Sequence, residues 1–297
     1  MKVSRPLLIA GLLLTSPTIG FAFEGTLKLR TISVERAQLP KVTGGAAPDA
    51  SQTLAITAKQ LLDAKDAGAQ VRESTVYVTP TKVRMDAPLD KDKPGYAIID
   101  TEKNTTWFVV PSEKRYIEWS EADAAAMSEK MVQVEKMMRE RMDSLPPEQR
   151  AQVEAMLKKM KGATAPDGKP AKVDLQSTGK TQTVNGMQTT AYEVKDDQET
   201  MVGWVTQEQP DLAKVLHNVQ DRMEQMTPPA MRGRQTARTA LNAKGFPVMV
   251  QTLDPQFYRV EEVTTVDKKP VSPDLFVVPK EYAKTTARDA LNSIPQQ

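Results

Sequence analysis

The chain has 297 residues with 40 basic and 38 acidic side chains, a formal charge of +2 that excludes the clustered basic excess of nucleic-acid-binding proteins. It has no cysteine and one histidine, His217, which excludes disulfides, thiol chemistry and a histidine-rich zinc site. Its length allows one large or two small domains.

The first 22 residues predict a cleavable signal peptide. Lys2 and Arg5 give a positive start, Pro6 to Leu14 is an apolar run, and the small residues Gly20 and Ala22 suit a cut after Ala22. The apolar run is shorter than the roughly 20 residues that span a bilayer, although an uncleaved anchor is the alternative interpretation.

A signal peptide predicts a periplasmic or extracellular protein. No cysteine follows the apolar run, so a lipid anchor is not expected. Removing residues 1–22 takes away two basic residues and leaves 38 basic against 38 acidic ones. No second long apolar stretch is present, so we expect the mature chain, residues 23–297, to be soluble, with no integral membrane segment, and to form a single domain.

The first part of the mature chain is predicted to be mainly β. Glu24 to Arg36 reads as a strand with a bulge or a switch of the buried face near Thr31, Leu39 to Ser51 as a flexible connection, and Thr53 to Ala67 as a helix. Residues 71–119 alternate apolar and polar side chains in five short strands separated by brief turns, which predicts an antiparallel meander. The strand Thr105 to Val110 is apolar on both faces, which favours a central position.

The apolar period then changes from strand-like to helical. Met127, Met131, Val134, Met138 and Met142 form one stripe on a predicted helix from about Glu121 to Asp143. A second helix follows the proline pair at 146–147 and ends at Gly162. The two predict a methionine-rich helical hairpin inserted at about 121–161.

The remaining residues predict strands, then helices, then strands. Asn185-Gly186 is a strong hairpin turn between strands within 172–194, and another strand covers 201–206. Amphipathic helices are expected at 210–226 and from Pro228 to Gly245, followed by a hairpin at 246–266. A short strand at 274–278 and a terminal helix at 280–292 complete the prediction.

Several segments together resemble an uncharacterised family of exported bacterial proteins: VYVTPTKVRMD, IIDTEKNTTWFVVPSEKRYIEW, NGMQTTAYEVKD and NAKGFPVMVQT…SPDLFVVP. That family is similar to the superfamily of the lipoprotein carrier LolA, which includes mycobacterial lipid carriers such as LppX and the sigma-factor regulator RseB. The resemblance covers most of residues 23–282. It implies an α+β fold in which a curved antiparallel sheet forms a half-open β-barrel, with helices packed on the concave face and acyl chains held between sheet and helices.

The sequence shows no catalytic constellation, so we expect neither an enzyme nor a cofactor. His217 lies at the edge of an amphipathic helix, where a structural histidine is common. Gly44-Gly45 lacks the strand–helix frame of a phosphate loop, and no GxSxG elbow is present. A methionine-based copper(I) site in the hairpin is a third hypothesis, because thioethers bind Cu(I), but methionine at helical spacing is more often an adaptable apolar filler.

We therefore expect a non-enzymatic envelope protein that binds an acyl chain, a lipid or another apolar ligand between sheet and helices. The alternative is a protein–protein interaction or sensor module that presents the hairpin at 121–161 to a partner. Alternation and helical spacing suggest which apolar residues line the ligand cleft: Val78, Met85, Trp107, Val109 and Trp119 from the sheet, and Met127, Met131, Leu216 and Met223 from the helices.

Overall fold

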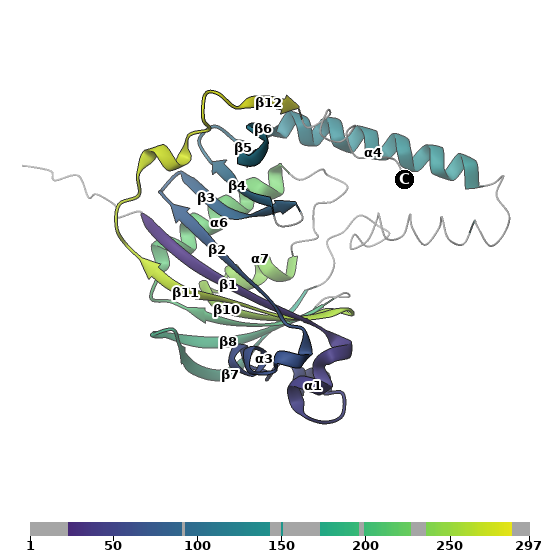
Figure 1. The fold of residues 1–297 in the computed structure, drawn as a ribbon, viewed down its shortest axis with the longest axis vertical. Coiled ribbons are helices and arrows are strands. Elements are labelled where there is room, and N and C mark those ends of the chain that lie inside the picture. Colours follow the sequence, from purple (N-terminus) through teal and green to yellow (C-terminus); the bar gives the residue numbers. More distant parts are fainter. Residues whose placement is uncertain are drawn as a thin grey trace, which may run out of the picture.

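In the computed structural model, the described residues are 23–90, 93–142, 150, 173–195, 199–226 and 236–286. Their strands form one large curved sheet that does not close, in the order β12-β6-β5-β4-β3-β2-β1-β11-β10-β9-β8-β7 (Figure 1). All neighbours are antiparallel except the parallel pair β12 and β6. The strands are β1 (Gly25–Glu35), β2 (Gln70–Val78), β3 (Lys82–Asp90), β4 (Lys93–Asp100), β5 (Thr105–Val110), β6 (Arg115–Ser120), β7 (Asp174–Val184), β8 (Met187–Lys195), β9 (Thr200–Thr206), β10 (Phe246–Leu253), β11 (Phe257–Asp267) and β12 (Ala283–Thr286).

Helices lie on both sides of this sheet. Two of them, α6 and α7, lie inside its curve, and α4 extends away from β6 (Figure 1). The α-helices are α1 (Leu39–Thr43), α2 (Ala50–Thr53), α3 (Ala58–Asp63), α4 (Glu121–Met142), α6 (Pro210–Gln225) and α7 (Thr236–Asn242). The 3₁₀ helices are η1 (Arg36–Gln38), η2 (Lys65–Ala67), η3 (Pro111–Glu113) and η5 (Pro273–Phe276). The fold is therefore α+β, as the sequence predicted.

The predicted meander at 71–119 is confirmed as strands β2 to β6. Its turns are short, and Asn104 and Lys114 adopt positive φ angles in the last two of them. The Asn185-Gly186 turn is confirmed as well, with φ of 48° and 82° at the two residues, the pair of left-handed conformations that a tight hairpin requires. The Asn185 side chain also donates a hydrogen bond to the Val263 carbonyl over 2.6 Å, which ties this turn to β11.

The main core lies between α6 and the concave face. Leu212, Val215 and Val219 recur at steps of three and four and are buried. Their partners come from strands on both sides of β1, so α6 holds the two halves of the sheet together. The buried members from the rest of the chain are Phe23, Leu27, Val76, Val78, Val83, Ile99, Val184, Met187, Phe246, Val248 and Val263.

A second concave cluster fixes α7 over β8, β9 and β10. Leu241 is fully buried there against Val194, Val205 and Val250. It lies so close to Gly203 that a Cβ on this glycine would be 2.2 Å from a Leu241 methyl carbon. A glycine is therefore needed in β9 for α7 to approach the strand.

The convex face is covered in two places. At one end, the segment from α1 to η2 packs Leu39, Ile56 and Leu61 against Ile32 and Tyr258. At the other end, the chain after β11 runs over the outside of β3 to β6 and adds β12 to the sheet (Figure 1). Val271 and Phe276 from this C-terminal segment pack on the strands β4 and β5.

Several local predictions were wrong. Residues 39–51 contain α1 and the start of α2, residues 273–276 form η5 rather than a strand, and residues 283–286 form β12 rather than a helix. The predicted switch of the buried face along β1 is confirmed, since Leu27 is buried on one face and Ile32 and Val34 on the other, whereas the register shift against β11 lies between Lys28 and Leu29. β5 is the third strand from one end of the sheet, while β4 is the strand buried on both faces from Tyr96 to Asp100.

Other predictions fall on residues outside the described ranges. These are the signal peptide predicted at 1–22 and the predicted second helix of the hairpin, of which only residue 150 is described. The first helix of the hairpin is confirmed as α4, and Ser120 and Asp123 cap it reciprocally: each backbone N–H is paired with the other side chain, at 3.0 and 3.3 Å. In the described part of the chain, no helix is both long and apolar enough to cross a membrane.

Candidate functional site

The concave face of β2 to β6 carries three of the predicted cleft residues. Val78 and Trp119 belong to one row of side chains across these strands, and Met85 belongs to the next row. Val78 is fully buried, and the Trp119 indole donates a hydrogen bond to the Met226 carbonyl over 3.0 Å. Met85, in contrast, is 41% exposed. The first row is therefore closed by the end of α6, whereas the second row is partly open.

Met223 shows the same partial opening from the side of α6. It lies four residues after Val219 and three before Met226, so all three share the side of the helix that faces the sheet. Val219 and Met226 are buried, but Met223 is 40% exposed.

We call the partly exposed apolar side chains of this region the concave apolar surface. Phe108 and Ile117 belong to the row of Met85 and are half-buried, and Leu216 is half-buried beside the main core. The concave apolar surface therefore consists of Met85, Phe108, Ile117, Leu216 and Met223. Met127, near the start of α4, is also half-buried, while the side chain of Met131 lies outside the described part of the structure.

Trp107 and Val109 do not share a face with the other predicted cleft residues. They alternate with Thr106 and Phe108 along β5, so their side chains point to the convex face. There Val109 is buried in the cluster with Phe276, and Trp107 packs beside it. The sequence pattern correctly paired Trp107 with Val109, but the structure places both under the C-terminal segment, away from Val78, Met85 and Trp119.

A pocket of about 460 Å³ on the convex face was not expected from the sequence. It lies between the α2–α3 segment and strands β7 to β10. Its floor includes Trp204 and Met249, Leu54 lies on the opposite wall, and Lys180 and Glu193 lie among its polar residues. Alternation along β9 places Trp204 on one face, but only the folded chain brings residues 50–57 across it.

The floor of this convex pocket is fixed by a buried hydrogen-bond network. Gln251 accepts a hydrogen bond from the Trp204 indole at 3.1 Å and donates to the carbonyls of Leu54 and Ile56 at 2.9 and 3.1 Å. The Tyr258 hydroxyl donates to Ile56 at 2.6 Å, and burial raises the pKa of this tyrosine far above its usual range. The network ties α2 and α3 to β10 and β11, a structural role.

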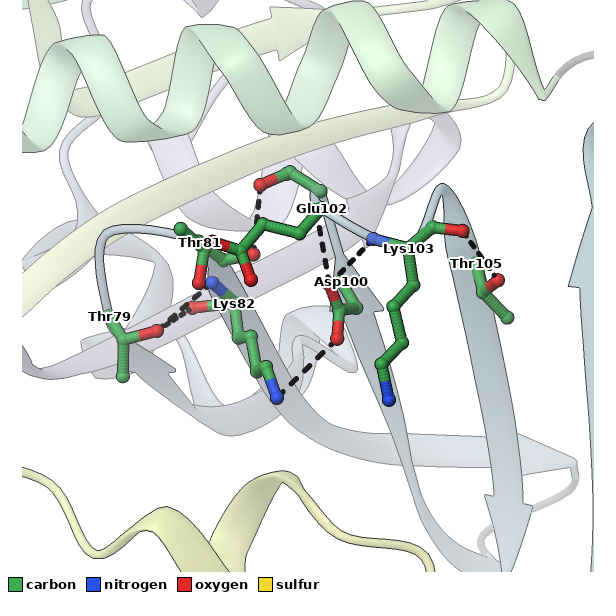
Figure 2. Close-up of polar contacts among 8 residues, drawn as sticks. Thr79, Thr81, Lys82, Asp100, Glu102, Lys103 and Thr105 are labelled. Atoms are coloured by element: carbon green, nitrogen blue, oxygen red, sulfur yellow. Dashed lines mark hydrogen bonds and ion pairs between the residues drawn. The ribbon is translucent and has the colours of Figure 1, made fainter.

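A buried carboxylate lies at the far end of β4. Figure 2 shows Asp100 accepting hydrogen bonds from the backbone N–H groups of Glu102 and Lys103, at 3.1 and 2.9 Å. Its other oxygen lies 3.4 Å from the Lys82 ammonium, and the side chain is 1% exposed. These contacts close the β4–β5 turn and join it to the β2–β3 turn, where Thr101 and Thr81 are also bonded. Asp100 Oδ1 therefore serves the turn, while the buried Oδ2 has no hydrogen-bond partner among the described residues and is approached only by Lys82.

The last groups to consider are the histidine and the side chains that could bind a metal ion. His217 is exposed, with Nε2 3.6 Å from an Asp221 carboxylate oxygen one helical turn away. Within the described ranges, no group of three or more histidine, cysteine, aspartate or glutamate side chains could hold a metal ion. The copper(I) hypothesis rests on methionines whose side chains lie largely outside those ranges and stays a prediction.

Comparison with solved structures finds two forms of one protein, titled "Structure of PNGF-II in P21 space group" and "Structure of PNGF-II in C2 space group". Each is 10% identical to this chain, with TM-scores of 0.34 and 0.36. The alignments cover 91% and 90% of this chain but 33% and 32% of those chains, so this chain spans about a third of their length.

No curated protein sequence matches this chain. These findings do not confirm the LolA-like relationship. A family model described as "Domain of unknown function (DUF4412)" matches residues 100–282, which is more than half of the chain and runs from the end of β4 to the C-terminal segment. The chain belongs to the DUF4412 family.

Proposed function

We propose that this chain is a non-enzymatic binding protein of the bacterial envelope that holds an acyl chain or another apolar ligand on its concave face. Export by residues 1–22 and cleavage near Ala22 would release it as a periplasmic or extracellular protein. The observation that supports the proposal is the partial exposure of Met85 and Met223, two apolar side chains directed into the space between sheet and α6.

The physical driving force for such binding is apolar burial. Removing apolar surface from water stabilises a complex by about 25 cal/mol per Å². Methionine suits a chain-like ligand because its unbranched side chain adapts to irregular contacts. A curved, unclosed sheet with helices on its concave side agrees with the half-open barrel of the LolA-like carriers, and that closer relationship is part of the proposal.

The test is titration with a fluorescent fatty acid, cis-parinaric acid. We expect saturable binding by the wild-type chain and a loss of at least about tenfold in affinity when Met85→Gln and Met223→Gln are combined, because glutamine keeps the side-chain length but costs desolvation. Met137→Gln is the matched control, since Met137 is 52% exposed on α4, outside the concave face. Equal affinity of the double variant and the wild type contradicts the proposal.

A second candidate function rests on α4. This helix extends away from the sheet (Figure 1), and among its described side chains the large apolar residues Val132 and Met137 are exposed. An exposed helix face of this kind suits a protein partner. Deleting residues 121–161 separates the candidates: a carrier that uses the hairpin as part of its cleft loses the fatty acid, whereas an interaction module keeps its fold and any fatty-acid binding and loses only its partner.

A further inference from the structure

The concave face changes from apolar to polar along β1 and β2. Val78 and Val76 are buried in the main core, but the following positions on the same face of β2 are Ser74 and Arg72. Across the same face, Leu27 and Leu29 of β1 give way to Thr31 and Ser33. The polar residues line a groove of about 420 Å³.

Two arginines flank this groove. Arg72 on β2 is paired with Thr31, and Arg259 on β11 is paired with Ser33, so the two lie on either side of β1, about 10 Å apart across the strands and roughly 7 Å apart along them. An arginine side chain is long enough for both guanidinium groups to reach a ligand above β1. Within the described residues, neither arginine has an ion pair or a side-chain hydrogen bond. The hydroxyls of Thr31, Ser33 and Ser74 lie beside them as further donors.

The one carboxylate in the groove is already neutralised. Glu261 lies opposite Thr31, and the Arg238 guanidinium of α7 approaches it at 3.0 Å. The groove therefore has two uncompensated positive charges. Planar guanidinium groups match the oxygen pairs of carboxylates and phosphates, so the complementary ligand group is an anion of one of these kinds.

The polar groove continues into the concave apolar surface. Ala87, which lines the groove, is two residues from Met85 and therefore lies on the same face of β3. We infer that the groove binds the anionic headgroup of an amphiphile, a carboxylate or phosphate held between Arg72 and Arg259, while the apolar chain lies along Met85 and its neighbours. This inference rests on the proposed function and specifies the class of its ligand.

The test compares palmitate with hexadecanol, a fatty acid and an alcohol of equal chain length, by displacement of a neutral fluorescent probe. Wild-type protein should bind palmitate about tenfold more tightly than hexadecanol, because the charged headgroup adds charge-assisted hydrogen bonds. Arg72→Gln and Arg259→Gln should each remove most of this preference and leave hexadecanol affinity unchanged. Lys28→Gln is the control, since it removes a positive charge from the exposed convex side of β1 and should change neither affinity.

The outcomes distinguish the two proposals. If neither ligand binds the wild-type chain, the proposed function fails and the headgroup site fails with it. If both ligands bind equally and the arginine variants change nothing, the carrier function stands and the headgroup site is refuted. Titration with inorganic phosphate tests whether the groove binds a free anion instead. Phosphate binding that depends on Arg72 and Arg259 but does not compete with palmitate would refute the inference that the groove binds an amphiphile headgroup.

Discussion

The Asp100 side chain closes the β4–β5 turn, and its two carboxylate oxygens have different partners. One oxygen accepts two backbone N–H groups, while the other faces the Lys82 ammonium from a fully buried position (Figure 2). Removing the side chain would leave the two N–H groups and the ammonium without this acceptor. The buried end of β4 thus depends on one carboxylate.

Substitution at Asp100 should separate these two contributions. We expect Asp100→Ala to lower the free energy of unfolding by about 1–3 kcal/mol, the cost of buried groups that lose their hydrogen-bond partner. Asp100→Asn keeps an oxygen for the turn and loses only the charge facing Lys82, so its loss should be smaller. Urea denaturation of both variants measures the difference. Equal losses would show that the charge, and not the turn, is the main contribution.

At the scale of elements, the placement of α7 depends on the absence of a side chain at Gly203. Gly203→Ala should destabilise the chain by about 1–3 kcal/mol, because the new Cβ would displace the fully buried Leu241 side chain within its packed cluster. Gly45→Ala is the control, since a Cβ there meets nothing within 4 Å. Thermal or urea unfolding measures both.

Combining Gly203→Ala with Leu241→Ala provides the decisive comparison. The double variant should lose less free energy of unfolding than the sum of the losses of the two single variants, because alanine at position 241 leaves room for the new methyl group at position 203. Strict additivity would show that the contact between β9 and α7 does not carry the cost.

The attachment of β12 should weaken in acid. Lys284 donates to Glu118 at 2.7 Å and the Trp107 indole donates at 3.1 Å, and the first of these chiefly lowers the pKa of Glu118 in the folded chain. A lowered carboxyl pKa stabilises the fold above the ordinary value of about 4.3, and the stabilisation is lost as the pH falls through the lower folded pKa.

Hydrogen-exchange protection of the β12 amides measures this effect. Protection should fall between about pH 5 and 3 in the wild type, by a small amount because the pair is partly exposed. In Glu118→Gln it should be lower at neutral pH and constant over the same interval. A wild-type profile that is flat over this interval would contradict the assigned role of the pair.

The sequence predicted those elements whose signals are local. The meander of β2 to β6, the Asn185-Gly186 turn and α6 all follow from alternation, turn residues or helical spacing. The strand β12 has no such signal, because it is stabilised by pairing with β6, which precedes it by more than 150 residues. The short helix α1 likewise depends on packing, because its Leu39 is buried in the cluster that contains Tyr258.

The candidate site was predicted only in part for the same reason. Alternation shows that Trp107 and Val109 share a face, but it cannot show which face is concave. That assignment depends on where α6 and the C-terminal segment pack. Arg72 and Arg259 are far apart in the sequence and become neighbours of β1 only through the order of strands β2-β1-β11. No local pattern identifies them as a pair.

At the scale of the whole molecule, the sheet has a closed part and an open part. The two concave clusters under α6 and α7 hold the curve in place, and the convex face is covered at both ends. What remains partly exposed on the concave side is apolar near Met85 and Met223 and basic near Arg72. This division suits an amphiphile, and it is the central claim of the proposed function.

Native mass spectrometry of the exported protein, purified from bacterial envelopes without detergent, can detect such an amphiphile bound to the chain. We expect a discrete noncovalent adduct with the mass of an anionic amphiphile, which is removed by organic extraction and restored by added palmitate. The combined Met85→Gln and Met223→Gln variant should carry little or none of it. If the wild type has only the mass of the polypeptide, before and after incubation with palmitate, the chain does not bind an amphiphile and the proposed function is wrong.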